Sequence, residues 1–282
     1  MVIKRIVEFT LFSSIFVAAC AVALSIETNL LLHLPLNNIS FYLFVFGATI
    51  VQYNLHYFFK KTAVINSHRL SWSLKNKNIH IVLLAVGCIL IMVSLFSFKL
   101  RHFYILSILG AIAFLYSFPA LPFKNRKRIK DYGFLKILTL ALLWTLVTVW
   151  FPVSDMSVGE TLYFFIFIKR FLFMFVLCLL FDIRDIDIDR TENIRTLPVL
   201  TGKRKSYNIA GLGLSLFFIF SVIQYFFFPD MAILIAMSLS ALATFFLMQL
   251  SKKIHSDVFY LAGIDGMMFL QAVLVYLFSL KL

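Results

Sequence analysis

The chain has 282 residues, of which 62% are hydrophobic and only 14% are charged. Soluble domains usually carry about 25% charged and about 45–50% apolar residues, so this composition excludes an ordinary soluble globule and indicates a protein whose solvent is largely lipid. The formal net charge of +13 does not indicate nucleic-acid binding, because the basic residues lie in short loops between apolar runs, where membrane topology and anionic lipid explain them.

Long apolar runs predict an all-α, polytopic membrane protein with about nine transmembrane helices. In lipid each backbone polar group must be bonded internally, so continuous runs of about 20 apolar residues form helices, whereas a barrel would show alternating segments. The first run follows Lys4 and Arg5, and we interpret it as a retained helix because it is too long for a signal peptide. The predicted helices occupy 6–26, 39–59, 79–98, 101–121, 134–152, 161–181, 207–228, 230–250 and 258–280.

Lysine and arginine are concentrated on alternate loops. They gather at the N-terminus and in the loops around 60–78, 122–133, 182–206 and 251–257, while the opposite loops contain acids such as Asp155 and Asp230. The positive-inside rule therefore predicts a cytoplasmic N-terminus and a C-terminus outside, in the cytoplasmic membrane if the protein is bacterial.

The three cysteines, Cys20, Cys88 and Cys178, lie within apolar runs and form no CxxC pair. We therefore predict no disulfide and no structural zinc.

An acidic run follows the sixth predicted helix. Asp182, Asp185 and Asp189 are spaced i, i+3, i+7 and share one face if that helix continues past the membrane edge. Carboxylates on one face repel unless a cation lies among them, and Mg²⁺ takes oxygen ligands and commonly bridges to substrate phosphates. The alternative is a solvated helix end that neighbouring residues such as Arg184 and Arg190 neutralise.

The residues around this acidic run resemble a motif of a known family. The segment 181–202 reads FDIRDIDIDRTENIRTLPVLTG, which resembles the second aspartate-rich motif of the UbiA superfamily of intramembrane prenyltransferases, with Asp182, Asp185 and Asp189 on the three aspartates. Arg195 begins the Thr-Leu-Pro tail of that motif. Tyr116, followed by Ser-Phe-Pro and then Lys124, resembles the Tyr-Pro-x-x-Lys-Arg stretch of the same family.

This resemblance implies a single transmembrane domain over 1–282, a UbiA-like helical bundle that binds a polyprenyl diphosphate. It implies Mg²⁺ at Asp182, Asp185 and Asp189, which neutralises the diphosphate so that the prenyl group can alkylate an aromatic or other lipophilic acceptor. It also implies that diphosphate or acceptor is bound by the remaining candidate residues, which are Asn54, Lys60, Tyr116, Lys124 and Arg195.

The first aspartate motif of that family is degenerate in this chain. Asn54 matches, but the aspartate positions hold Leu55, Phe58 and Thr62, and no acid occurs between Glu27 and Asp131. Three interpretations remain open: an atypical transferase with Lys60 or Lys61 as a fixed cation, a non-catalytic protein that binds a lipid or prenyl diphosphate, and a protein whose substrate has no diphosphate.

Two adjacent cations, Lys169 and Arg170, lie midway along the sixth predicted helix. A charge at that depth costs at least ~2.5 kcal/mol on insertion scales, so we expect both side chains to face the bundle interior. They are candidates to bind an anionic group of an acceptor or to pair with an acid such as Asp265. They also suggest a transporter, although the sequence lacks the paired interrupted helices typical of that class.

Overall fold

The computed structural model describes residues 2–59, 68–117, 133–191 and 193–280, and every regular element in these ranges is helical. The prediction of an all-α protein is thus confirmed for the described residues. In chain order the elements are α1 (Val2–Phe12), α2 (Ile15–Leu31), α3 (Ile39–Phe59), α4 (His68–Lys75), α5 (Lys77–Leu95), α6 (Leu100–Ser117), α7 (Gly133–Thr145), the π-helical turn η2 (Leu146–Trp150), η3 (Phe151–Val153), α8 (Glu160–Arg184), α9 (Ile186–Thr191), α10 (Leu197–Thr201), α11 (Lys203–Phe227), α12 (Met231–Leu250), the π-helical turn η4 (Phe259–Ile264) and α13 (Gly266–Ser279).

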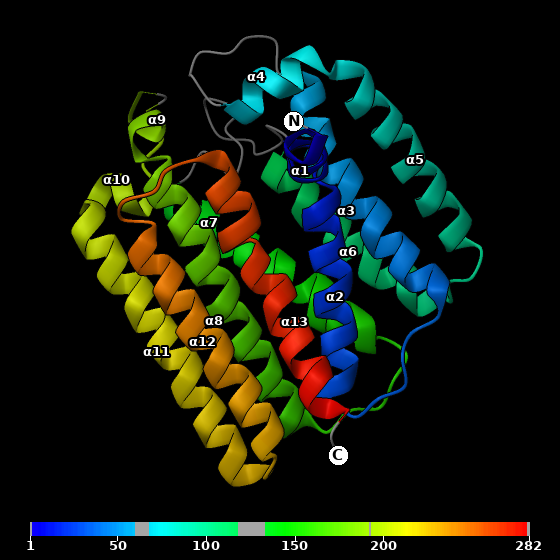
Figure 1. The fold of residues 1–282 in the computed structure, drawn as a ribbon. Helices are drawn as coiled ribbons and strands as arrows, with labels where there is room; N and C mark the ends of the chain where they lie inside the picture. Colours follow the sequence, from blue (N-terminus) through cyan, green and yellow to red (C-terminus); the bar gives the residue numbers. More distant parts are fainter. Residues whose placement is uncertain (1, 60–67, 118–132, 192, 281–282) are drawn as a thin grey trace.

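The helices form one bundle, with the short elements α4, α9 and α10 at one end (Figure 1). α8 packs against α7 and α11, α11 against α12, α12 against α13, and α13 against α2. The turn η2 contacts α2 and closes this ring, while α3 lies outside α2 and α5 lies outside α3. α1 lies at the same end as α4, α9 and α10, and α13 ends at the opposite end.

Six helical segments of the described chain are long and apolar enough to cross a membrane. The bent pair α1–α2 forms a seventh if it is counted as one span, and the apolar parts of α3 and α6, Ile39–Leu55 and Leu100–Tyr116, are shorter. The six segments are Lys77–Leu95, Gly133–Val153, Glu160–Arg184, Lys203–Phe227, Met231–Leu250 and Phe259–Ser279. The protein is therefore an integral membrane protein.

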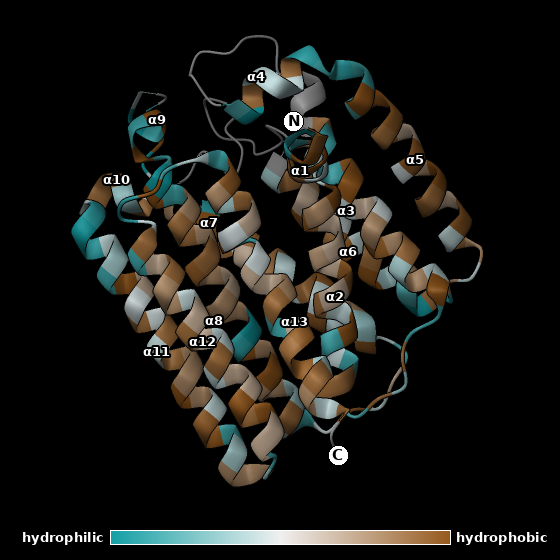
Figure 2. Cartoon of the chain, in the orientation of Figure 1, coloured by the Kyte–Doolittle hydropathy of each residue, from teal (hydrophilic) through white to brown (hydrophobic). Residues whose placement is uncertain are grey.

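The outer surface of the bundle suits lipid. Large apolar side chains such as Ile89 on α5 and Phe246 on α12 are exposed, whereas polar residues gather at the ends and at a few interior points (Figure 2). Water would solvate such a surface poorly, while acyl chains cover it without loss.

The first predicted helix is in fact two helices that meet at 61°. Ser14, between them, has a left-handed backbone (φ 68°), and both Ser13 and Ser14 are fully buried. The guanidinium of Arg69 donates a hydrogen bond to Ser14 Oγ at 3.0 Å, which ties α4 to this bend. Hydropathy could not reveal the break because the apolar run continues through it.

Two glycines let α3 and α5 approach closely. A Cβ on Gly47 would lie 2.9 Å from the carbonyl oxygen of Gly87, and a Cβ on Gly87 would lie 2.8 Å from Val51 Cγ2. Close backbone approach at small residues is a common way to pack helices in lipid, where dispersion contacts replace the hydrophobic effect between helices.

Candidate functional site

The acidic run after α8 is divided between a helix end, a turn and a short helix. α8 ends at Arg184, with Asp182 in its last turn. Asp185 follows in a non-helical conformation (φ −87°, ψ 8°), and Asp187 and Asp189 lie on α9. The spacing predicts three carboxylates on one continuous helical face, and the break at Asp185 interrupts that face.

The carboxylates of Asp182 and Asp189 converge on one lysine. Lys136, in the first turn of α7, places its Nζ 2.9 Å from Asp182 Oδ1 and 3.6 Å from Asp189 Oδ2. Asp182 and Asp189 are only 5% and 4% exposed, so water screens these ion pairs less than it would at a surface. The structure thus brings two of the three predicted aspartates together around a partly buried cation, the side chain of which is 21% exposed.

A glycine brings α7 close enough for this contact. A Cβ on Gly133, at the start of α7, would lie 1.3 Å from the carbonyl oxygen of Arg195, which no side chain could tolerate. α7 therefore packs directly on the backbone of the Thr-Leu-Pro tail, one turn before Lys136. The side chain of Arg195 is exposed, so it is the backbone of this residue that contacts the site.

Asp185 belongs to a neighbouring cluster. Its carboxylate accepts two hydrogen bonds from Arg184, from Nε at 2.7 Å and from Nη2 at 3.1 Å. Arg184 also lies 3.6 Å from Asp257 Oδ1 and stacks over the rings of Phe181 and Tyr260, 5.0 and 4.9 Å from their centroids. Charge pairing and cation–π contact fix this guanidinium beside the site.

Asp187 faces solvent. Its side chain is 74% exposed and forms loose ion pairs with Arg190 and Lys203, at 3.6 and 3.7 Å. It therefore provides an internal comparison for its buried neighbours.

Of the other predicted contacts to the diphosphate, Asn54 is engaged within the bundle and two lysines are not described. The Asn54 amide is fully buried, donates hydrogen bonds to the carbonyl oxygens of Ser13 (3.1 Å) and Ile50 (2.8 Å), and contacts His80 Nδ1 through its oxygen. Lys60 and Lys124 lie outside the described residues.

Tyr116 is half-buried in the last turn of α6 and interacts electrostatically with Lys136. The structure therefore places this predicted tyrosine near the lysine that the aspartates contact.

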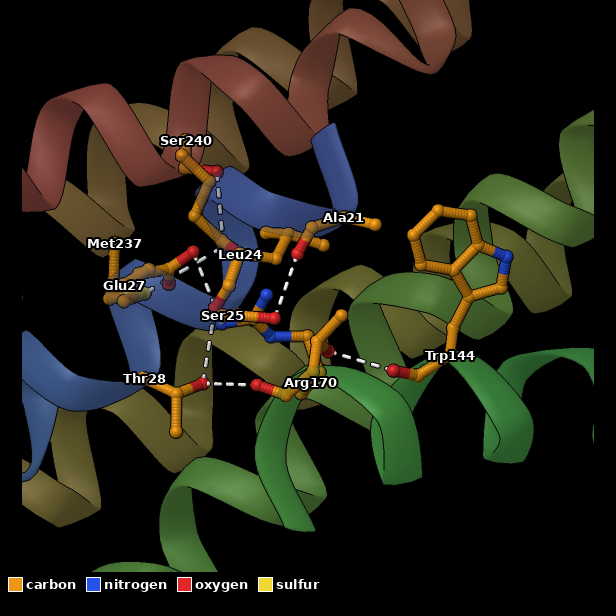
Figure 3. A network of polar contacts seen from close by, with 11 residues as sticks. Ala21, Leu24, Ser25, Glu27, Thr28, Trp144, Arg170, Met237 and Ser240 are labelled. Atoms are coloured by element: carbon orange, nitrogen blue, oxygen red, sulfur yellow. Dashed lines mark hydrogen bonds and ion pairs between the residues drawn. The ribbon is translucent and has the colours of Figure 1, made fainter. Parts of the chain in front are cut away.

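Arg170 belongs to a second polar cluster, deep inside the bundle. Its Nη2 lies 3.1 Å from Glu27 Oε2 and 3.4 Å from the carbonyl oxygen of Leu24, both on α2 (Figure 3). Arg170 and Glu27 are almost completely buried. The anionic partner is thus Glu27 and not Asp265, whose electrostatic partners are Arg69 and Arg184.

Lys169 is equally buried, and its Nζ has no hydrogen-bond partner among the described residues. It lines a small cavity with Ser221 and Gln224, and interacts electrostatically with Glu27. Asp182 lies twelve residues after Arg170 on the same helix, about 18 Å away at 1.5 Å per residue. The prediction that both cations face the interior is confirmed, but they do not reach the aspartates.

The aspartate pair has donor atoms that fit a divalent cation. Asp182 Oδ2 is buried and accepts no hydrogen bond from the described residues, while Asp189 Oδ2, also buried, lies 3.6 Å from Lys136 Nζ. Mg²⁺ is usually held by one or two carboxylates together with substrate phosphates, so two oxygens suffice. No group of three or more His, Cys, Asp or Glu side chains converges within the described ranges. Burial raises the pKa of Asp189, an effect that the Lys136 ammonium opposes.

Sequence reasoning missed Lys136 and Glu27 as members of these clusters. Lys136 lies inside the apolar run of the predicted helix 134–152, where a charge is costly in lipid, and this position could have indicated a role for it. Glu27 was the last acid before a long acid-free stretch, which could have suggested that it neutralises Lys169 and Arg170.

The sequence model of the UbiA prenyltransferase family matches residues 64–264. No curated protein is similar enough in sequence to be matched.

Among solved structures, a UbiA homolog from Archaeoglobus fulgidus bound to GPP and Mg²⁺ superposes with a TM-score of 0.67 at 10% identity, over 97% of this chain and 99% of that chain. A digeranylgeranylglyceryl phosphate synthase matches with a TM-score of 0.61 at 16% identity, over 99% of both chains. The apo UbiA homolog from Aeropyrum pernix K1 gives 0.56 at 15% identity, over 97% and 96%. At these identities the likeness establishes the fold.

Proposed function

The chain belongs to the UbiA prenyltransferase family, and from this premise we propose that it transfers a polyprenyl group from its diphosphate to an aromatic or other lipophilic acceptor. The observation that carries the proposal is the convergence of Asp182 and Asp189 on Lys136 at one end of the bundle. Similar folds bound to GPP or DMAPP with Mg²⁺ support a prenyl diphosphate as the donor.

The reaction begins with rupture of the bond between the allylic carbon and the diphosphate oxygen. The diphosphate leaves with the electron pair, the allylic carbon bonds to the acceptor, and the acceptor loses a proton. Charge therefore develops on the departing diphosphate, and positive groups held in place beside it lower the barrier. Lys136 provides one such group.

Asp182 and Asp189 would hold Mg²⁺, Asp182 through its Oδ2, which has no hydrogen-bond partner among the described residues. When bound, Mg²⁺ supplies Lewis-acid neutralisation of the diphosphate. Asp185 would join them only by exchanging its contact with Arg184. Tyr116, Asn54, Lys60, Lys124 and Arg195 remain proposed contacts to the diphosphate, and Lys169 and Arg170 remain proposed contacts to an anionic acceptor group.

We further propose a single domain over 1–282 with nine spans, a cytoplasmic N-terminus and the aspartates on the cytoplasmic side. The six long apolar segments, the bent α1–α2 pair and the shorter α3 and α6 are consistent with this number. The concentration of Lys and Arg at the end that carries the aspartates supports the orientation.

A specific observation favours a second candidate function, non-catalytic binding of a lipid or prenyl diphosphate. Leu55 and Phe58 stand at first-motif aspartate positions, and Asn54 is bound within the bundle. Half of the family's metal ligands are therefore replaced, which would weaken departure of the diphosphate more than its binding.

Purified protein in lipid nanodiscs, incubated with labelled geranylgeranyl or farnesyl diphosphate and candidate acceptors, separates the two functions. We expect Mg²⁺-dependent release of diphosphate that Asp182→Asn abolishes, because that substitution removes a buried charge beside the substrate. Asp187→Asn is the matched control and should retain full activity, since Asp187 is solvent-exposed. Tight binding of the prenyl diphosphate without release of diphosphate, with every acceptor tested, would support the non-catalytic function instead.

A further inference from the structure

We propose that Lys136 is a resident cation that takes the place of one metal ion, so that this site holds one Mg²⁺ and one ammonium where its family uses two aspartate motifs. The inference rests on the proposed function, since it concerns the same diphosphate. It is carried by the placement of Lys136 between two buried carboxylates and by the substitutions at the first motif.

The ammonium occupies the position of a bridging cation. Lys136 Nζ contacts Asp182 Oδ1 at 2.9 Å and Asp189 Oδ2 at 3.6 Å, and so joins carboxylates from two separate elements, α8 and α9. Asp182 Oδ2 remains buried and accepts no hydrogen bond from the part of the chain that the structure describes. The pair can therefore keep its ammonium and still offer an oxygen to one metal ion.

The charges around the site agree with a single metal. Two carboxylates and one ammonium leave one net negative charge, which one Mg²⁺ converts to one net positive charge facing the diphosphate. A second Mg²⁺ would need further carboxylates, but the first-motif positions hold Leu55, Phe58 and Thr62. Asp185 is already paired with Arg184.

The backbone holds Lys136 in place. Gly133 lies against the carbonyl of Arg195 without room for a Cβ, so at this point α7 packs directly on the backbone of the Thr-Leu-Pro tail. Lys136 therefore lies one helical turn after the contact between Gly133 and Arg195. A lysine binds phosphate as a compact point charge, which suits it to replace an ion rather than a bidentate ligand.

The test counts metal ions and does not rely on turnover. Mn²⁺ serves as the spectroscopically visible substitute for Mg²⁺, and inorganic pyrophosphate serves as the probe for the diphosphate. Electron paramagnetic resonance of the full chain in nanodiscs should give one bound Mn²⁺ per chain at saturating pyrophosphate. Two bound ions per chain would overturn the inference.

Lys136→Met gives a second test, in which the affinity for Mn²⁺ and the affinity for pyrophosphate should change in opposite directions. Without the competing ammonium, Mn²⁺ alone should bind more tightly, whereas pyrophosphate should bind about ten- to a hundredfold more weakly at saturating Mn²⁺, as expected for loss of one hydrogen bond to a charged group. A purely structural role would weaken both, and unchanged pyrophosphate affinity would equally overturn the inference. Lys136→Arg should restore most of the pyrophosphate affinity.

Lys75→Met is the matched control, because Lys75 is an exposed lysine on α4, and it should change neither affinity. The failures of the two proposals are distinguishable. A wild-type chain that binds no pyrophosphate or prenyl diphosphate contradicts the proposed function itself. A chain that transfers prenyl groups with two bound Mn²⁺ contradicts only the role of Lys136.

Discussion

Asp182 and Asp187 belong to the same acidic run, but their surroundings differ. Asp182 is buried beside Lys136, whereas Asp187 is exposed to solvent. Asp182 and Asp189 both contact Lys136, although the continuous helical face that the i, i+3, i+7 spacing predicts is interrupted at Asp185. The pattern could not reveal that a turn at Asp185 directs this carboxylate to Arg184, because ion pairing and helix termination depend on tertiary contacts.

At the residue scale, we expect Glu27→Gln to destabilise the protein by about 3–5 kcal/mol, because it leaves Arg170 buried without its counter-charge. Thermal unfolding in detergent measures the effect. Asp155→Asn is the control: it breaks the more exposed Asp155–Lys99 pair at 2.9 Å and should change stability by about 0–1 kcal/mol. Equal effects of the two substitutions would contradict the importance of burial.

The raised pKa of Asp189 predicts how metal binding depends on pH. A carboxylate must lose its proton to bind Mg²⁺, and Asp189 regains its proton at a higher pH than an ordinary aspartate, whose pKa is about 3.9. Mn²⁺ affinity should therefore fall as the pH decreases, before exposed carboxylates titrate. Folding stability depends on pH in the opposite direction. Burial favours the protonated form of Asp189, so the contribution of this group to the free energy of unfolding decreases as the pH rises through its pKa in the folded state.

Titration of Mn²⁺ binding across acidic pH in wild type and in Asp189→Asn checks this dependence. The variant should bind more weakly and lose the corresponding inflection. An inflection that persists in Asp189→Asn would assign the titration to another group.

At the scale of elements, hydropathy located the long helices and placed most of their ends within a few residues. The predicted segment 161–181 corresponds to α8, Glu160–Arg184, and 230–250 corresponds to α12, Met231–Leu250. The bend between α1 and α2 and the π-helical turns η2 and η4 were missed, because each lies within an apolar run. Close contacts at glycine were also invisible, since a glycine in a membrane helix has no distinctive pattern without its partner.

Gly133→Ala tests the contact between α7 and the Thr-Leu-Pro tail. The added methyl would overlap the Arg195 carbonyl, so α7 must shift and carry Lys136 away from the aspartates. We expect a loss of about 1–3 kcal/mol in stability together with weaker pyrophosphate binding. Gly110→Ala on α6 is the control, because its Cβ would meet no atom within 4 Å. Wild-type binding by Gly133→Ala would show that Lys136 does not depend on this approach.

Gly47→Ala tests the packing of α3 on α5. Alanine gains up to about 1 kcal/mol of helix propensity, but its Cβ would lie 2.9 Å from the Gly87 carbonyl oxygen, and overpacking typically costs about 1–3 kcal/mol. We therefore expect a lower unfolding temperature. Gly211→Ala, whose Cβ would only reach Met248 at 4.0 Å, should be neutral or stabilising. A stabilising Gly47→Ala would contradict the close approach.

At the scale of the whole molecule, the family and the helical fold could be predicted from the sequence because a short motif and a long hydropathy pattern agree. The deep polar cluster could not, since it joins Glu27 to Arg170 across the bundle. Orientation in the membrane rests on the distribution of Lys and Arg and is open to direct measurement.

Single cysteines provide that measurement. A membrane-impermeant maleimide should label Lys99→Cys in intact cells, because Lys99 lies in the loop between α5 and α6 at the end opposite the aspartates. Lys252→Cys, in the loop after α12, should be labelled only after permeabilisation. The reverse pattern would invert the proposed topology.

The Glu27–Arg170 pair also has a consequence for biogenesis. A nascent α8 brings two adjacent positive charges to the bilayer, and neither is easily accommodated there alone. Translation delivers α2 long before α8, so a negative charge is already available when those cations arrive. We expect truncated chains that lack α1 and α2 to integrate α8 poorly, and synthesis from the N-terminus thereby sets an order in which the bundle can assemble.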